Sequence, residues 1–301
     1  MIKFLSRTKK FKLPKAFLTY LNHYKYVFNP SYYEHRNYKY LAIRCSNGKS
    51  EGVISYLLIY KSNDDITIYN LNKYYNATTN YVADPKIFFA GEKLYFTFNN
   101  GYISNGANSI FLAELKFNKI ISTKECIYKN RKRIEKNWAF INYKNKLHVI
   151  YSISPFVLLK IRKVSELEIE FEDDFTINNN VGNLSLGTPA LEFAKNDYLL
   201  IAHKKIQIKK KRIYFGIPIL INLNNRKVTN FKNKILIHSI KNTLFPGYLF
   251  NPNLYSCTYF SGIFFKKDNL FLCYGINDNN YNIVKVDKNI QNDKNLFLEY
   301  K

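Results

Sequence analysis

The chain has 301 residues, of which 47% are hydrophobic and 17% aromatic, and it carries a formal net charge of +24 at pH 7. This apolar content is too high for an intrinsically disordered chain and is sufficient to build a sizeable core. The positive charge would attract nucleic acids or membranes if it were concentrated, but many lysines are dispersed among asparagine, isoleucine and tyrosine.

The clustered positive charge lies in three short stretches, residues 7–15, 129–136 and 203–212. A solvated surface with a bias toward lysine is the simplest interpretation of these patches. An anionic substrate and a peripheral association with an acidic membrane surface are the alternatives. Because the patches are short and separate, we predict no nucleic-acid partner.

Residues 1–27 form a basic N-terminal segment, and this segment lacks the uninterrupted apolar run of a signal peptide. No run elsewhere approaches the length of a membrane-spanning helix, so we expect a cytoplasmic protein. The cysteines lack the close spacing of metal ligands. We therefore predict reduced thiols, no metal site and no cofactor. These cysteines are Cys45, Cys126, Cys257 and Cys273.

Five apolar, strand-like runs recur along the chain after residue 28. They begin at intervals of 54, 53, 51 and 72 residues, at Lys39, Lys93, Lys146, Asp197 and Asn269. A second short element precedes each run, and its middle residue lies 8 or 9 residues before the start of the run. These elements are residues 29–31, 84–86, 137–139, 188–190 and 260–262. A third apolar strand follows in each unit, which is typical of a small antiparallel sheet.

This repeat predicts an all-β fold, a five-bladed β-propeller over residues 28–288. One small sheet cannot bury both of its faces alone, whereas radial stacking of several sheets does so. We expect residues 289–301 to form a tail that closes or flanks the last blade. An open β-sandwich with coincidental spacing is the alternative architecture.

The innermost strands of propeller blades line a central channel, so equivalent positions in different repeats should approach one another. These positions are Asn29, Asp84, Asn137, Thr188 and Phe260. Asp84 is the only acid among them, and we expect it at the mouth or wall of a polar funnel. In the alternative, structural interpretation, Asp84 accepts backbone N–H bonds in a turn before Pro85.

Several segments, taken in their order and spacing, resemble a known group of enzymes. They read ADPKIF, EKNWAFINYKNKLHVIYSISP, LGTPAL, YLLIAHKK, RIYFGIPILINL and YFSGIFFKKDNLFLCYGINDNNYNIVKV. Over residues 28–288 they resemble the β-mannoside phosphorylases of glycoside hydrolase family 130. They also resemble the β-1,2-mannosyltransferases and phosphorylases of glycosyltransferase family 108. The resemblance implies a five-bladed propeller with a single catalytic acid.

The resemblance places that acid at Asp84, in a segment that reads Glu-Asp-Pro-Arg in the family. It implies that inorganic phosphate attacks the anomeric carbon with inversion while the acid protonates the leaving sugar. Ordinary glycosidases need two carboxylates, so the lack of a second acid at the converging positions favours phosphorolysis or transfer. A general acid needs a raised pKa, which the apolar neighbours of Asp84 favour and which Lys86 and Lys136 oppose.

The resemblance also implies which residues bind the anionic group and the sugar. The phosphate or donor group would bind Arg44, Lys136, His203 and Tyr214, which should make the funnel positively charged. Sugar hydroxyls would bind Asp278, which matches an acid of the family's last blade, and we add Asn29 and Asn137 from their place in the funnel. The structural alternatives are a satisfied core histidine at 203, a solvated lysine at 136, a core aromatic at 138 and a turn residue at 278.

Two residues beside Asp84 depart from the family's pattern. Ala83 stands where the family has Glu, and Lys86 stands where it has Arg, so a bidentate contact to phosphate or sugar is lost. The donor is therefore left open between a sugar phosphate and a sugar nucleotide, with a glycan as acceptor. We predict transfer or phosphorolysis of a mannosyl-like group, and slightly favour a cytoplasmic transferase that builds a cell-surface glycan. The alternative is a non-catalytic propeller that binds a glycan or an acidic partner.

Overall fold

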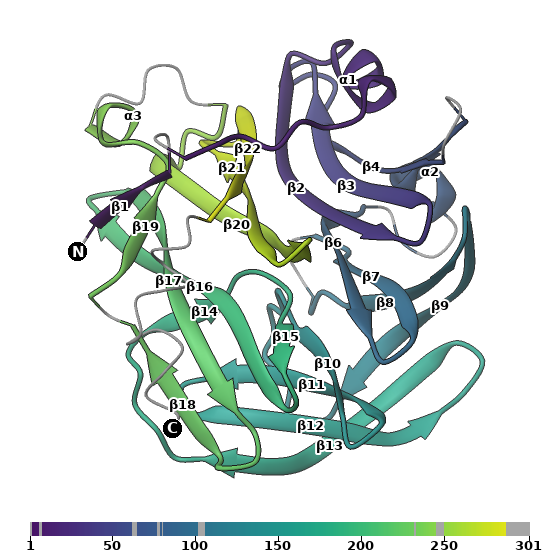
Figure 1. Ribbon diagram of the computed structural model, residues 1–301, viewed down its shortest axis with the longest axis vertical. Coiled ribbons are helices and arrows are strands. Elements are labelled where there is room, and N and C mark those ends of the chain that lie inside the picture. Colours follow the sequence, from purple (N-terminus) through teal and green to yellow (C-terminus); the bar gives the residue numbers. More distant parts are fainter. Residues whose placement is uncertain are drawn as a thin grey trace.

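The structure is a computed structural model that describes residues 2–5, 8–61, 65–76, 79, 81–101, 106–231, 233–244 and 250–286 (Figure 1). Most of these residues lie in β-strands, which confirms the predicted all-β class. The helices of this part of the chain are α1 (Lys15–Leu21), α2 (Leu71–Tyr74) and α3 (Ile240–Leu244). None of them is long and apolar enough to cross a membrane. The predicted tail, residues 289–301, lies outside the described residues.

The first group of strands forms an antiparallel sheet of its own. It runs in the order β2 (Tyr26–His35), β3 (Tyr38–Ser46), β4 (Ile54–Tyr60) and β5 (Ile66–Asn70). Most residues of β3 and β4 are buried, and the others are half-buried. The continuous apolar runs of the sequence thus correspond to strands that are covered on both faces.

The next two groups are joined into one eight-stranded sheet. The first group is β6 (Ala83–Ala90), β7 (Lys93–Asn99), β8 (Ile110–Lys116) and β9 (Lys119–Tyr128). The second is β10 (Ala139–Tyr143), β11 (Lys146–Ile153), β12 (Phe156–Val164) and β13 (Glu168–Ile177). Neighbours within each group are antiparallel, whereas β13 pairs with β9 in parallel and so connects the groups.

The remaining strands form a second compound sheet. Its first part comprises β14 (Leu184–Leu186), β15 (Leu191–Ala194), β16 (Asp197–Ile208), β17 (Lys211–Asn222) and β18 (Lys227–Asn230). Its second part comprises β20 (Leu254–Lys266), β21 (Asn269–Ile276) and β22 (Asn280–Lys285), and β20 pairs in parallel with β17. The short β19 (Ile235–Ile237) pairs with β17 and with the N-terminal β1 (Ile2–Phe4).

The N-terminal basic segment packs against these sheets. Its strand β1 runs parallel to β19. Three apolar side chains that follow it, Leu13, Phe17 and Leu21, are buried in one cluster with residues of β2, β3, β4 and β21. Leu13, Phe17 and Leu21 therefore share a hydrophobic core with the strands that follow them.

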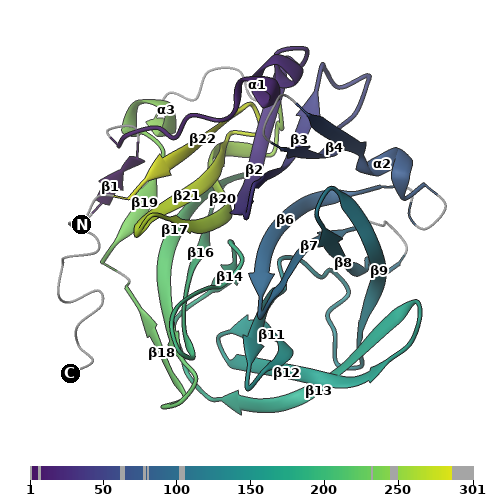
Figure 2. The ribbon, with the colours of Figure 1, turned by 45° about the vertical axis from the view of Figure 1, so that its right-hand side comes forward.

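The strand groups surround a common centre (Figure 2). Strand β6 contacts β2, β10 and β20, although these strands lie far apart in the sequence. Each of the five predicted runs forms a strand. In its group, this strand pairs with the strand or strands nearest the centre. Four of them start at the first residue of β7, β11, β16 and β21, and Lys39 is the second residue of β3. The predicted repeat of strands is confirmed.

The hydrophobic core lies mainly between neighbouring groups. One cluster joins β3 and β4 to β6, β7 and β8, and another joins β6 and β8 to β10, β11 and β12. At the second boundary the rings of Phe88 and Phe140 stack with centroids 5.5 Å apart. Full burial of such a ring contributes about 1.5–3 kcal/mol, so contacts between groups hold the centre together.

Backbone irregularities coincide with four of the five short elements that precede the repeats. The pairing register shifts in β2, β6 and β20 at these elements. Asn29, Asp84 and Asn137 have φ angles of 53°, 49° and 60°, in the left-handed region. Asn and Asp tolerate this conformation better than other residues with a side chain. A bulge re-aims the side chain it carries, and here it directs the equivalent residues of different groups toward the centre.

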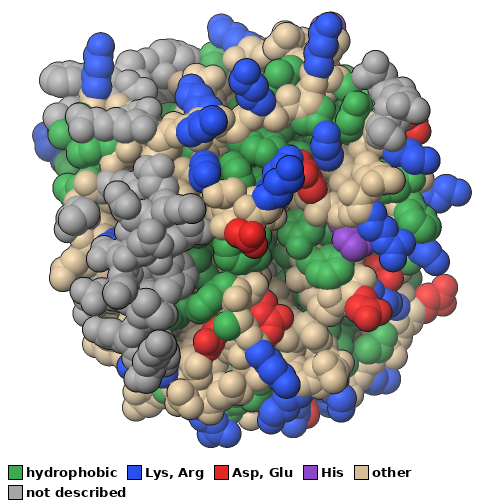
Figure 3. Space-filling model, in the orientation of Figure 1, with side chains coloured by type: hydrophobic (Ala, Val, Ile, Leu, Met, Phe, Trp, Pro, Cys, Tyr) green, Lys and Arg blue, Asp and Glu red, His purple; other side chains and the backbone are tan. Residues whose placement is uncertain are grey.

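The positive charge is spread over the surface. Figure 3 shows lysine and arginine side chains around the edge of one face, with acidic side chains among them nearer the middle. This distribution fits the interpretation of dispersed, solvated lysines for most of the charge.

Candidate functional site

Two of the equivalent bulge residues meet at the centre. Asn29 donates its side-chain N–H to Oδ1 of Asp84 at 3.4 Å, across 55 residues of sequence. Asn29 itself fits closely against the backbone of Gly275, where an added Cβ would lie 2.0 Å from Oδ1 of Asn29. The predicted convergence of these two positions is confirmed, and the glycine makes room for it.

The other equivalent positions differ in character. The hydroxyl of Thr188 accepts a hydrogen bond from the backbone N–H of Ile201, and Phe260 is fully buried in the hydrophobic core. These two residues support the wall of the centre, and among the five equivalent positions the Asn and Asp side chains come from the first three groups.

Asp84 forms an ion pair with an arginine of the neighbouring group. Nη1 of Arg44 lies 2.8 Å from Oδ1 of Asp84, and the two side chains are only 14% and 11% exposed. Nη2 of Arg44 donates to the hydroxyl of Tyr81 at 2.6 Å. The Nε–H of Arg44 is buried and has no acceptor among the described residues. The side-chain partners of Asp84 are thus residues from other strands, which favours the site interpretation over a turn cap.

The pKa of Asp84 departs from the expectation for a general acid. Burial alone would raise it, but the charges of Arg44, Lys136 and Lys86 and the hydrogen bond from Asn29 outweigh burial and hold the pKa below its usual value. Asp84 is therefore ionised at neutral pH in the unliganded protein. The raised pKa that a general acid requires is absent here because three cations lie around the carboxylate.

Lys86 is a site residue that the sequence interpretation missed. It is 1% exposed, and its Nζ donates to Oδ1 of Asn137 at 2.6 Å and to the carbonyl of Gly187. Nζ also lies 5.5 Å from the ring centroid of Tyr259. Burial lowers the pKa of Lys86 to about 7. A buried amine with this pKa exchanges its proton near neutral pH, which marks a candidate functional residue.

Asn137 lies at the centre of an internal network. Its Oδ1 accepts from Lys86 and, at 3.0 Å, from the hydroxyl of Tyr259, while its Nδ2 donates to the carbonyl of Leu186 at 2.9 Å. The residue predicted to bind sugar therefore holds Lys86 and Tyr259 in place. Tyr259 was also missed, because it stands beside the equivalent position rather than on it.

His203 contributes no positive charge to the site. It is 2% exposed, and its Nε2 accepts the backbone N–H of Phe260 at 2.9 Å. Burial and, next, the charge of Lys86 lower its pKa to about 3. The ring packs 4.4 Å from that of Tyr259. Burial and the accepted hydrogen bond keep the ring neutral, with its proton on Nδ1, so any positive charge of the funnel comes from its other residues.

We expect the imidazole of His203 to show no titration between pH 5 and pH 8. Its pKa of about 3 leaves it neutral over that whole range. Two-dimensional NMR of the imidazole nitrogens, assigned with a His203→Gln variant, measures this directly. Protonation near the ordinary histidine pKa of about 6.5 would contradict the buried, accepting geometry.

Tyr214 and Lys136 border the same region. The rings of Tyr214 and His203 lie 6.4 Å apart, and burial raises the pKa of Tyr214. Lys136 is exposed, and its charge acts on Asp84 and Lys86. The preceding residue, Glu135, accepts Nε1–H of Trp138 at 2.9 Å and so anchors the loop. Trp138 is a buried core aromatic, and the loop presents Lys136 beside the carboxylate.

A second carboxylate faces the same part of the molecule. Asp278 accepts Nδ2–H of Asn251 at 3.1 Å through Oδ2. Burial and the charge of Asp84 raise its pKa, against the opposing effects of Asn251 and Arg44. The five converging positions hold a single acid, but the fold brings this further acid from β21's end close to Asp84.

Arg44 and Asp278 open onto a shared cleft of about 470 Å³. Its remaining lining residues are Phe28, Lys49, Val53, Phe250, Asn251 and Pro252. Clefts of about 300–1,000 Å³ accommodate small-molecule ligands. The cleft thus offers a cation, a carboxylate and aromatic rings to one ligand.

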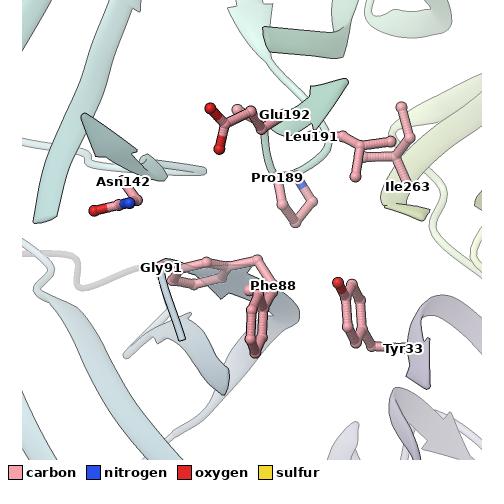
Figure 4. A pocket seen from close by; sticks show the side chains of 10 residues that line it. Tyr33, Phe88, Gly91, Asn142, Pro189, Leu191, Glu192 and Ile263 are labelled. Carbon is pink, nitrogen blue, oxygen red and sulfur yellow. The ribbon is translucent and has the colours of Figure 1, made fainter. Parts of the chain in front are cut away.

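A smaller cavity, of about 240 Å³, lies further along β6 from Asp84 (Figure 4). Phe88, Tyr33 and Pro189 line it, and Glu192 and Asn142 lie at its rim in the same view. Its residues come from all five strand groups, as expected for the far end of a central channel.

The residues described by the structure include no group of three or more His, Cys, Asp or Glu side chains placed to hold a metal ion. The four cysteines are buried, unpaired thiols.

Comparison with known proteins identifies the fold. No protein-family model matches the chain, and no curated protein matches it. A β-1,2-mannobiose phosphorylase from Listeria innocua has a TM-score of 0.59 at 13% identity, covering 92% of this chain and 93% of its own.

Two further solved structures agree. A member of the GH130 family, described as targeting β-1,2 mannosidic linkages in Candida mannan, has a TM-score of 0.58 at 11% identity, covering 87% and 84% of the two chains. A glycosyl hydrolase from Bacteroides ovatus has a TM-score of 0.60 at 10% identity, with the same two coverages of 87% and 84%. These neighbours are propeller-type enzymes, and at such identities the likeness establishes the fold alone.

Proposed function

We propose that the protein is a five-bladed β-propeller enzyme that transfers a mannosyl-like group between a glycan acceptor and an anionic donor. The blades would be β2–β5, β6–β9, β10–β13, β14–β18 and β20–β22. The donor carries a phosphate or a nucleoside diphosphate. The observation that carries the proposal is the Arg44–Asp84 ion pair, whose arginine lines a cleft together with Asp278.

Each part of the cleft suits one part of such a substrate. The guanidinium of Arg44, which lines the cleft, supplies donors for phosphate oxygens, and a guanidinium binds phosphate in a bidentate manner. The exposed Lys136, whose charge acts on Asp84, is assigned as a second donor. Asp278 can accept hydrogen bonds from sugar hydroxyls, and Phe28 and Phe250 supply apolar surface for the sugar ring. The likeness to mannoside phosphorylases supports this class of substrate.

The ionised state of Asp84 favours the synthetic direction. An acceptor hydroxyl attacks the anomeric carbon, the bond from that carbon to the donor's phosphate oxygen breaks, and the carboxylate takes the hydroxyl proton as general base. A base must be unprotonated before the reaction, and the cations around Asp84 keep it so. The leaving phosphate carries its electron pair away, and Arg44 and Lys136 stabilise the added charge.

In the degradative direction Asp84 would have to donate a proton. A phosphate that binds Arg44 would compete with Asp84 for the guanidinium. Burial, the largest influence on this carboxyl, would then raise its pKa. The same ion pair thus links occupancy of the anion site to the protonation of Asp84.

The function is tested by a screen of hexose 1-phosphates and nucleoside diphosphate hexoses. A ligand at 100 times its Kd stabilises the folded state by about 2.7 kcal/mol, which a melting curve detects. Stabilising donors are then incubated with mannose oligosaccharides, and release of phosphate or nucleoside diphosphate is measured. Release that depends on the acceptor supports the transferase. Binding of oligosaccharides without any turnover would instead support a glycan-binding propeller.

We expect Lys136→Ala to weaken binding of the anionic donor by about tenfold, the usual effect of losing one hydrogen bond to a charged group. Its melting temperature should stay unchanged because the side chain is exposed. Isothermal titration with the donor identified in the screen measures the affinity. Lys146→Ala removes another exposed lysine at the start of β11 and should leave the affinity unaltered. Equal effects of the two substitutions would argue against the assignment.

A further inference from the structure

The hairpin of β16 and β17 carries the third basic patch of the sequence, which the proposed reaction does not use. Its strands are the paired segments Asp197–Ile208 and Lys211–Asn222. On the side away from β17, β16 pairs with β14 only as far as Lys204. The outer part of β16 is thus an edge strand that leads to the turn at Lys209 and Lys210.

The outer part of this hairpin combines strong positive charge with exposed apolar side chains. Its cations are Lys204, Lys205, Lys209, Lys210, Lys211 and Arg212, and no acid interrupts them. Ile206 is 42% exposed and Ile208 is 47% exposed. Exposure of an isoleucine side chain to water is unfavourable. Exposed isoleucines beside clustered cations therefore indicate an interaction surface.

The isoleucines lie on one face of the hairpin. Side chains alternate along a strand, so Ile206 and Ile208 point to the same side. Their cross-strand partners are Ile213 and Lys211 respectively. The result is an apolar strip with lysines at its end, while the opposite face of the hairpin carries Tyr214 toward the catalytic region.

We propose that the tip of the β16–β17 hairpin docks on an anionic lipid bilayer. Lysine side chains would contact acidic headgroups, and the isoleucines would insert among the acyl chains. Both components are needed for a lipid surface, whereas a nucleic acid or an acidic polysaccharide offers no apolar layer for the isoleucines.

A second exposed hairpin shows that apolar exposure alone does not mark this surface. At the turn between β12 and β13, Val164 is 54% exposed and Leu167 is 72% exposed. Glu166 and Glu168 lie beside them, and an anionic bilayer would repel these carboxylates. Of these two hairpins with exposed apolar side chains, only the β16–β17 tip therefore has the positive charge that favours binding to an anionic bilayer.

Docking at this tip would orient the cleft relative to the bilayer. Arg212, which pairs with Gln207 within the patch, acts electrostatically on Asp278, and Tyr214 packs near His203. The hairpin thus connects the docking tip to the border of the site. Docking itself does not depend on the proposed transferase activity.

Sedimentation with vesicles tests the proposal on the full chain. Vesicles of phosphatidylcholine with 30% phosphatidylglycerol should bind the protein, and pure phosphatidylcholine vesicles should bind it far more weakly. The triple variant Lys209→Gln, Lys210→Gln, Lys211→Gln should reduce binding on the order of a hundredfold, at roughly fivefold per lysine. Ile206→Ser with Ile208→Ser should reduce it by tenfold or more.

Matched controls separate the hairpin from the overall charge. Lys119→Gln, Lys144→Gln, Lys146→Gln removes the same charge elsewhere, and Val164→Ser with Leu167→Ser removes apolar side chains that are even more exposed than the isoleucines. Both should bind vesicles like the unaltered protein. Losses in the controls equal to those in the hairpin variants, or binding to RNA or heparin but not to vesicles, would overturn the proposal.

A fluorescent probe reports insertion even if a hairpin variant folds poorly. Ile208→Trp adds a second tryptophan to a protein whose only other one, Trp138, is buried. The emission of the added tryptophan should shift to shorter wavelength with the acidic vesicles. Vesicle binding without that shift would overturn insertion of the isoleucine strip.

Discussion

The Asp84→Asn variant is expected to lose at least a hundredfold in turnover, the usual scale for removal of a general acid or base. Asparagine keeps the size of the side chain and tolerates the left-handed backbone found at this position, but it cannot accept or release the proton. Turnover is measured with the donor and acceptor that emerge from the screen. Because Arg44 loses its counter-ion, affinity for the anionic donor should rise at the same time.

Stability distinguishes this catalytic role from a structural one. The amide oxygen of the Asp84→Asn variant can still accept from Arg44, so we expect a loss of about 1–3 kcal/mol in unfolding free energy. As a matched control, Glu34→Gln removes one partner of the 2.7 Å ion pair with Lys266, and should leave turnover intact. If folded Asp84→Asn protein turned over substrate at nearly the normal rate, Asp84 would have no part in the chemistry.

The Lys86→Met variant is expected to abolish a pH dependence of stability. In the unfolded chain the lysine has a pKa near 10.5, whereas burial lowers it to about 7 in the folded protein. Between these values the unfolded state binds a proton that the folded state does not. Stability should therefore rise with pH from about 7 to 10, by up to about 1.4 kcal/mol per pH unit, and be independent of this group below pH 7.

Urea unfolding at pH 7, 8, 9 and 10 measures the slope for each protein. Methionine fills a similar volume without a charge, but it leaves Oδ1 of Asn137 and the carbonyl of Gly187 without their donor, so the variant also loses about 1–3 kcal/mol. Lys146→Met, on the surface, should keep the slope of the unaltered protein. An unchanged slope in Lys86→Met would show that this amine is not the titrating group.

Local patterns predicted the strands and part of the site. Apolar runs at regular intervals identify the strands that begin at Lys93, Lys146, Asp197 and Asn269, because a strand covered on both faces needs a continuous apolar run. The constant spacing of the preceding elements predicted that Asn29 and Asp84 would meet. Both results follow from the sequence repeat. Residues at the same place in different repeats occupy equivalent places around the centre of the fold.

Other features of the site depend on contacts that no local pattern encodes. His203 is neutral because β20 offers it the backbone N–H of Phe260, 57 residues away. In the sequence, Lys86 was interpreted only as a replacement of the family's arginine. In the structure, its Nζ donates hydrogen bonds to both Asn137 and Gly187. Asp278 comes near Asp84 through the packing of the last strands on the first, which the composition of either segment does not indicate.

The strand groups differ in how many hydrogen-bonded strand pairs connect them to other groups. Among the described strands, β2 to β5 form a sheet that shares no ladder with the others, whereas each of the two larger sheets combines several groups through a parallel pair. Regions with fewer shared hydrogen bonds open at lower free-energy cost, so amide hydrogens of β2–β5 should exchange through sub-global openings that leave the larger sheets closed. Arg44 belongs to the sheet that opens and Asp84 to one that stays closed. Transient opening of the β2–β5 sheet would then break and re-form the Arg44–Asp84 ion pair. Such openings would let a ligand enter and leave the site without the movement of one domain relative to another.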